Sequence, residues 1–195
     1  MIKPKAFETQ AVHAGQEDPD KDSASRAVAI SATSSFVFDS ADHAAAVFAD
    51  LAPGNQYGRM HNPTTKVFEA RLNALEGGAR TVALSSGQAA TTSLLLSLSQ
   101  PGAQILMSKE VFGGTISVVR KILHPWGCQV KLIDPTAEAV ASFAGPRTVG
   151  VWVETIANPS LTVPNIPSLA EACHEVGVPL IVDNTSSPVI CKPIE

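Results

Sequence analysis

Several short stretches of this sequence carry groups that could bind a small ligand, and the first of them is a glycine turn. Ser85-Ser86-Gly87 follows the apolar run 81–84, and Gln88 then opens a segment of helical length. This order is typical of a strand, a tight turn and a helix, because Gly87 lets the backbone turn sharply. The free N–H groups at the start of such a helix favour an anion, most naturally a phosphate. The alternative is an ordinary strand-to-helix turn without a ligand.

Three later stretches place aromatic, amide and carboxylate side chains after further apolar runs. Phe112 precedes two glycines and is either a ring beside a ligand or a loop aromatic that covers the core. Asn158 offers an amide, although its turn with Pro159 is a common one. Asp183 directly follows the run 180–182, at the rim of a buried strand, where carboxylates seldom occur without a partner. It could cap the next turn or face a ligand cation.

The elements that must position these residues alternate along the chain. Strands are expected at 81–84, 104–107, 129–133, 149–153 and 179–182, and helices at 88–99, 114–123, 136–143 and 167–176. This alternation predicts an α/β fold with a mostly parallel sheet and helices on both of its faces. Ligands of such sheets bind beyond the carboxyl ends of the strands. We therefore expect the four stretches to meet at one edge of the sheet.

The N-terminal part of the chain shows a different pattern. Residues 1–39 lack helical periodicity and are expected to form an extended arm that packs on the body or on a neighbouring subunit. Ser40 would cap a helix over 41–51. A strong helix is expected over 63–76, because a proline opens it and two glycines follow it.

The composition excludes several classes of protein. With 195 residues, 45% of them hydrophobic, the chain can bury one sizeable core. A net charge of −4 without a basic run argues against nucleic-acid binding. The three cysteines, Cys128, Cys173 and Cys191, form no CxxC pair, which favours a reducing compartment and no metal site. No long apolar stretch or signal-peptide core is present, so a soluble cytoplasmic protein without a membrane partner is expected.

The four stretches together describe one ligand. It has a phosphate for the turn at Gly87, a flat ring for Phe112, a polar ring substituent for Asn158 and a basic ring nitrogen for Asp183. Pyridoxal phosphate (PLP) has all four features, and a carboxylate partner to its ring nitrogen is the expected electronic control. A plain dinucleotide-binding domain is disfavoured, because no glycine-rich fingerprint follows a strand.

The sequence resembles the Cys/Met-metabolism PLP-dependent enzymes, which include cystathionine synthases and lyases, methionine γ-lyase and the O-acylhomoserine sulfhydrylases. The resemblance runs nearly the whole length and rests on FETQAVHAGQ, YGRMHNPTTKVFEARLNALEGG, LSSGQAA, VFGGT, ETIANPSLTVPNI and VDNTSSP. The HAGQ opening, the FDSADHAA segment and the GNQYGRMHNPTT block most resemble the O-acetylhomoserine sulfhydrylases.

The resemblance implies the large domain of a fold-type-I PLP enzyme that forms a homotetramer from close dimers. Tyr57 and Arg59 would reach the cofactor phosphate of the neighbouring subunit, and Tyr57 is also suited to substrate proton handling. Phe112 stands where the family usually has a tyrosine stacked on the ring, so the stacking is kept and the hydroxyl is lost. Asn158 would contact the ring oxygen and Asp183 the ring nitrogen. The cofactor-binding positions in this part of the chain are Ser86, Gly87, Gln88, Phe112, Asn158, Asp183 and Thr185.

The family's essential residue is a lysine that holds the cofactor as a Schiff base, roughly two dozen residues beyond the aspartate. Such a position would lie past Glu195. Lys192 lies in the wrong motif to replace it, and Lys109, Lys121 and Lys131 lie at other strand-to-helix positions or on solvated faces. The expected domains are therefore 1–60, an arm with a dimer-contact segment, and 61–195, a PLP-binding domain incomplete at its C-terminal end. The chain is expected to be the N-terminal piece of a longer protein, or else a short product without lysine-dependent chemistry.

The function implied by the resemblance is γ-replacement on O-acetylhomoserine, in which sulfide or a thiol gives homocysteine or methionine. One alternative is the elimination chemistry of methionine γ-lyase or the reactions of the cystathionine synthases and lyases. Another is a non-catalytic fragment that acts as a scaffold or complements a separate chain.

Overall fold

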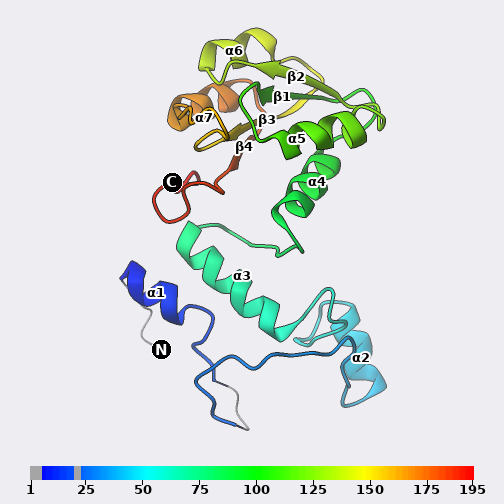
Figure 1. Ribbon diagram of the computed structural model, residues 1–195. Coiled ribbons are helices and arrows are strands. Elements are labelled where there is room, and N and C mark those ends of the chain that lie inside the picture. Colours follow the sequence, from blue (N-terminus) through cyan, green and yellow to red (C-terminus); the bar gives the residue numbers. More distant parts are fainter. Residues whose placement is uncertain (1–5, 20–22) are drawn as a thin grey trace. The chain divides into compact units, whose positions relative to one another are not determined.

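The computed structural model describes residues 6–19 and 23–195, which form two compact units (Figure 1). The first unit contains the described residues up to Ala83, and the second contains Leu84–Pro193. The domain boundary expected near residue 60 stays a prediction.

The first unit contains three helices, α1 (Phe7–His13), α2 (Ala41–Phe48) and α3 (Pro63–Glu76). The predicted cap of α2 is present, since Oγ of Ser40 accepts a hydrogen bond from the amide of His43 at 3.0 Å. The helix α3 has the bounds expected from its proline and glycines. Gly77 ends it in the left-handed conformation, with φ of 75°.

The expectation of an arm without helix is wrong for the stretch that forms α1, and residues 1–5 and 20–22 lie outside the described part. Glu8 in the first turn of α1 and His13 in its last turn suit the helix dipole. The helix also contacts α3, and Nε of Arg71 donates to the carbonyl of Ala14 at 3.0 Å. Tertiary packing therefore stabilises a helix too short to be seen in the sequence pattern.

The second unit is built on a four-stranded sheet with the order β2-β1-β3-β4, in which every neighbouring pair is parallel. The strands are β1 (Gln104–Ser108), β2 (Gln129–Ile133), β3 (Thr148–Glu154) and β4 (Leu180–Asp183). The helices are α4 (Gly87–Leu98), α5 (Gly113–Val118), the π-helical turn η1 (Val119–Leu123), α6 (Ala137–Phe143) and α7 (Ile166–Glu175). The predicted α/β fold class with a parallel sheet is confirmed.

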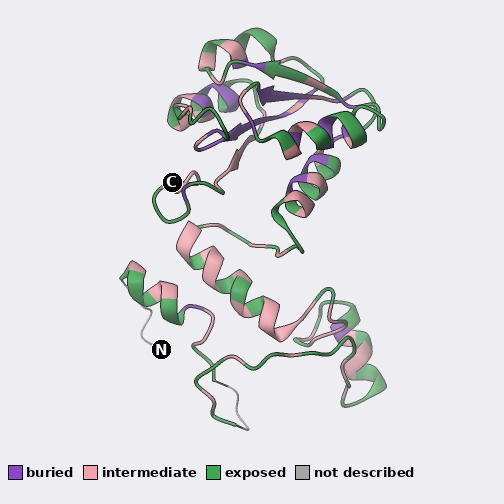
Figure 2. Cartoon of the chain, in the orientation of Figure 1, coloured by how far each residue is buried: buried purple, intermediate pink, exposed green. Residues whose placement is uncertain are grey.

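The sheet is covered on both faces, and each face carries its own apolar core (Figure 2). Because side chains alternate along a strand, Ile105 and Met107 of β1 point to one face while Leu106 points to the other. The first face packs under α4, α5 and η1, and the second under α6 and α7. Burial on both faces explains why the inner strands β1 and β3 are near-continuous apolar runs.

The strand expected at 81–84 is wrong, because this run is irregular. Its side chains are not packed as those of a sheet strand would be, since 71% of Val82 is exposed. The amide of Ala83 donates to Oε1 of Glu69 at 2.8 Å and not to a neighbouring strand. An apolar run becomes a strand only where another strand is available to pair with it.

The order of the strands creates a crevice at their carboxyl ends. The chain passes from β1 to β2 on one side and then crosses to β3 on the other side of β1. The connections after β1 and β3 therefore leave in opposite directions, and open α/β sheets bind their ligands in the crevice between two such connections.

Among the helices of the described ranges, none has the length and apolarity that a bilayer crossing requires.

Candidate functional site

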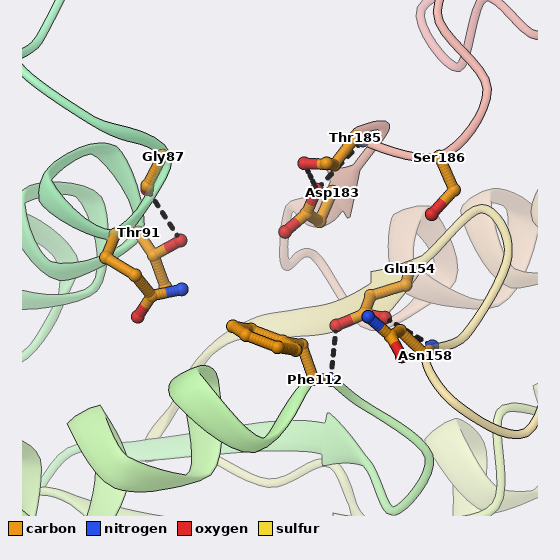
Figure 3. A pocket seen from close by; sticks show the side chains of 9 residues that line it. Gly87, Thr91, Phe112, Glu154, Asn158, Asp183, Thr185 and Ser186 are labelled. Carbon is orange, nitrogen blue, oxygen red and sulfur yellow. Dashed lines mark hydrogen bonds between the residues drawn. The ribbon is translucent and has the colours of Figure 1, made fainter.

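A pocket of about 280 Å³ opens at the carboxyl ends of the strands, within the second unit (Figure 3). Its size is close to the lower end of small-molecule sites, ~300 Å³. Six of the residues expected from the sequence line it, namely Gly87, Gln88, Phe112, Asn158, Asp183 and Thr185. Thr91, Glu154 and Ser186 complete the lining. The four stretches therefore lie together at one edge of the sheet, as expected.

The first wall of the pocket is the N-terminus of α4. Oγ of Ser86 accepts a hydrogen bond from the amide of Ala89 at 3.1 Å, so Ser86 caps the helix and does not line the pocket. The amides of Gly87 and Gln88 remain as donors at the helix start. A methyl group added at Gly87 would meet no heavy atom within 4 Å, so the space beside it is open. This wall fits a phosphate group.

The second wall is the ring of Phe112, which follows β1 at the start of α5 and is 44% exposed. The ring lies against Gly114, where an added Cβ would stand 2.5 Å from Cε1 of Phe112 and 3.2 Å from Cδ of Gln88. Glycine is therefore needed at this position for the ring to lie along the pocket. The exposed face of Phe112 fits a flat aromatic ligand.

The third wall is the carboxylate of Asp183 at the end of β4. Its Oδ1 accepts hydrogen bonds from the amide of Thr185 at 3.0 Å and from Oγ1 of Thr185 at 2.5 Å. In the described part of the chain, no such bond is made by Oδ2. This oxygen of a half-buried carboxylate fits a protonated ring nitrogen. The turn beyond it is held by the buried Ser187, whose Oγ donates to Oγ1 of Thr155 at 2.7 Å.

The sequence interpretation assigned no role to Thr91, Glu154 or Ser186, and Glu154 is the most informative of these three pocket residues. It ends β3 and is buried, and its two oxygens accept hydrogen bonds from the amides of Phe112 and Asn158. The signal was present, because Glu154 directly follows an apolar run in the same way as Asp183 does. The rule that a carboxylate at the rim of a buried strand has a partner applies to both.

Tyr57 and Arg59 belong to the first unit and are not among the residues that line the pocket. Tyr57 forms an isolated antiparallel bridge with Ser35. Cζ of Arg59 lies 5.6 Å from the centroid of the Tyr57 ring, within the range of a cation–π contact. These contacts show the two side chains as neighbours but do not test the role expected for them.

The pocket is lined by no lysine among the described residues. Lys109 pairs with Asp134 at 2.5 Å, and this hydrogen bond and charge raise the pKa of Lys109 above its ordinary value. A lysine held protonated in this way is a poor nucleophile. Nζ of Lys131 lies 3.5 Å from the centroid of the Phe143 ring, and Nζ of Lys192 lies 2.9 Å from Oε1 of Glu195.

Within the described ranges, no group of His, Cys, Asp and Glu side chains has the arrangement of a metal site.

The close contact at Gly114 gives a first testable prediction. The Gly114→Ala variant should lower the free energy of unfolding by about 1–3 kcal/mol, because the added methyl group overlaps the Phe112 ring. Gly113→Ala is the matched control in the same helix, since its added methyl group meets no heavy atom within 4 Å. Urea unfolding of both variants measures the difference. Equal stability of the two variants would contradict the packing of Phe112 on Gly114.

Comparison with known proteins identifies relatives of this chain. The sequence model of a family described as "Cys/Met metabolism PLP-dependent enzyme" matches residues 8–195. Homocysteine synthase of Schizosaccharomyces pombe is 42% identical over 100% of this chain and 46% of its own length. O-acetyl-L-homoserine sulfhydrylase 1 of Thermus thermophilus is also 42% identical, over 92% of this chain and 43% of its own length.

The fold has a close counterpart among solved structures. A crystal structure from Campylobacter jejuni that contains N'-pyridoxyl-lysine-5'-monophosphate superimposes with a TM-score of 0.92 at 27% identity. The match covers 98% of this chain and 47% of the Campylobacter chain. The chain thus spans less than half the length of the relatives that it matches.

Proposed function

The chain belongs to the family of Cys/Met-metabolism PLP-dependent enzymes, and we propose that the pocket of its second unit binds pyridoxal 5'-phosphate. The phosphate is assigned to the amides of Gly87 and Gln88, with Ser86 as the cap that orients them. The ring is assigned to the space between Phe112 and Asp183. The observation that carries this proposal is that Oδ2 of Asp183 makes no hydrogen bond within residues 6–19 and 23–195 and shares one pocket with the start of α4.

The residues of the pocket have distinct proposed roles. When bound, the cofactor supplies an electron sink for bond breaking at the α-carbon of an amino-acid substrate. Asp183 keeps the proton on the ring nitrogen, and Thr185 holds Asp183 in place through two hydrogen bonds. Phe112 shields one face of the ring from water but has no hydroxyl with which to move a proton. Asn158 presents its amide to the ring oxygen.

Two further residues are proposed to act across a subunit interface. Tyr57 and Arg59 reach the cofactor phosphate of a neighbouring subunit in a dimer of dimers, and Tyr57 also handles a substrate proton. The support for this is the match of the whole YGRMHNPTT block to the family, together with the pairing of the two side chains. The guanidinium of Arg59 suits a phosphate because it can donate two parallel hydrogen bonds.

For the protein to which these residues belong, we propose γ-replacement on O-acetylhomoserine in the cytoplasm, with sulfide or a thiol as the second substrate. The products would be homocysteine or methionine. The support is that named relatives at about 40% identity are homocysteine synthases and O-acetylhomoserine sulfhydrylases. The cofactor-binding lysine, which also moves the substrate protons, is proposed to come from outside residues 1–195.

Product analysis tests this function. A purified protein that contains residues 1–195 together with the cofactor-binding lysine is incubated with PLP, O-acetylhomoserine and sulfide, and homocysteine is the expected product. Release of 2-oxobutanoate and ammonia without sulfide would instead indicate elimination, and cystathionine formed from cysteine would indicate cystathionine synthesis. If that lysine-containing protein binds PLP but forms none of these products, the result would contradict the proposed γ-replacement and favour the non-catalytic alternative.

A further inference from the structure

Glu154 ends the strand β3 and is buried in the wall of the pocket, with only 6% of the residue exposed. Its Oε1 accepts a hydrogen bond from the amide of Phe112 at 2.6 Å. Its Oε2 accepts one from the amide of Asn158 at 3.0 Å (Figure 3). One carboxylate therefore accepts a hydrogen bond from the connection after β1 and another from the connection after β3, which lie on opposite sides of the crevice.

We propose that Glu154 is a positioning residue that sets where Phe112 and Asn158 stand against the ring of the ligand. The carbonyl of Phe112 accepts a hydrogen bond from the amide of Thr115 at 2.9 Å, within the first turn of α5. The bond to Glu154 fixes the amide on the other side of the same Cα. With both backbone groups of Phe112 held, only its side-chain torsions remain to place the ring.

The second bond of Glu154 acts on the loop that carries Asn158. Other residues of this loop have their own support, since the amide of Ala157 donates to the carbonyl of Thr162 at 2.9 Å and Oγ of Ser160 donates to Oε2 of Glu110 at 2.7 Å. Glu154 holds the one residue of the loop that lines the pocket. The amide group of the Asn158 side chain is thereby presented from a fixed backbone.

The chemistry of the two bonds requires a carboxylate. Both amides are donors, and a carboxylate offers an acceptor on each oxygen, whereas glutamine would turn a donor toward one of the two amides. Alanine would leave both amides without their partner. Glu154 is also the Cα partner of Asp183 in the parallel pair of β3 and β4. The ends of two adjacent strands therefore position the aromatic wall, the amide and the carboxylate of the pocket together.

The first test concerns the amides and needs no ligand. Hydrogen exchange of the purified protein without cofactor, resolved to single residues by NMR, should show slow exchange at Phe112 and Asn158. In Glu154→Ala both amides should exchange at least about 10-fold faster, and in Glu154→Gln only one of them should. Glu138→Gln, a change at an exposed glutamate of α6, should leave both rates as in the wild type. Fast exchange in the wild-type protein would overturn the inference, even if the variants do not fold.

The second test rests on the proposed function and separates positioning from general stability. In Glu154→Ala the dissociation constant for pyridoxal phosphate should rise about 10-fold, while that for inorganic phosphate changes less than about twofold. The reason is that Glu154 holds the groups for the ring and does not hold the start of α4. Equal weakening of both ligands, or no weakening, would overturn the positioning role. A wild-type protein that binds phosphate but not pyridoxal phosphate would refute the proposed cofactor, and the exchange rates would still decide whether Glu154 holds the two loops.

Discussion

Replacing Asp183 with asparagine is expected to lower kcat for γ-replacement about 100- to 1,000-fold, the range found when one fixed electrostatic partner is removed from an active site. The carboxylate of Asp183 uses Oδ1 for Thr185 and keeps Oδ2 for the ring nitrogen. An asparagine amide can make the same contacts with Thr185, but it carries no charge to hold a proton on that nitrogen. The electron sink is then weakened while the pocket keeps its shape.

The measurement is the initial rate of homocysteine formation by the protein that contains these residues and the cofactor-binding lysine, together with its dissociation constant for pyridoxal phosphate. Asp134→Asn is the matched control, because Asp134 is an exposed carboxylate that pairs with Lys109 outside the pocket. The control should keep the wild-type kcat. If kcat falls no further in Asp183→Asn than in Asp134→Asn, the role given to Asp183 is contradicted.

The Leu106→Ala variant is expected to lower the free energy of unfolding by about 2–5 kcal/mol. Leu106 is fully buried in the middle of β1, an inner strand of the sheet, and it packs in the core under α6 and α7. Truncation removes apolar contacts on all sides and leaves a cavity that rigid strands cannot close.

Leu132→Ala is the control for this change, because Leu132 lies on the neighbouring edge strand β2 and is 50% exposed. Its free energy of unfolding should fall by less than about 1 kcal/mol, since little buried area is lost. Urea unfolding of the two variants gives the comparison. A cost at Leu106 that is no larger than the cost at Leu132 would show that the core under α6 and α7 is not packed as described.

The elements that the sequence predicted well are those with local signals at both ends. The helix α3 has a proline at its first position, Asn62 as its cap and Gly77 after its last residue, and its bounds agree with the expectation. The edge strand β2 contains Lys131 and is largely exposed, whereas the strands β1, β3 and β4 are predictable because they form apolar runs between helices. The run 81–84 has the same appearance but no strand beside it, and pairing partners are not visible in a local pattern.

The site could be predicted because a parallel sheet brings the carboxyl ends of its strands to one edge. That rule predicts that Phe112, Asn158 and Asp183 lie near one another, and they line one pocket. Gly87 lines the same pocket although the run before it, 81–84, is not a strand. The same rule places Glu154 at that edge because it ends β3, but it does not reveal what Glu154 does, since its partners are two backbone amides and backbone donors are not distinguished in a sequence. The unit boundary after Ala83 is equally hidden, because it follows from contacts between distant residues.

The central claim is that this pocket holds pyridoxal phosphate between the start of α4 and the end of β4. The most direct measurement is a crystal structure of the purified protein with pyridoxal phosphate. We predict density for the phosphate at the amides of Gly87 and Gln88, for the ring on Phe112 and for the ring nitrogen facing Oδ2 of Asp183. A cofactor bound at another place, or a ring nitrogen turned away from Asp183 in this pocket, would contradict the claim.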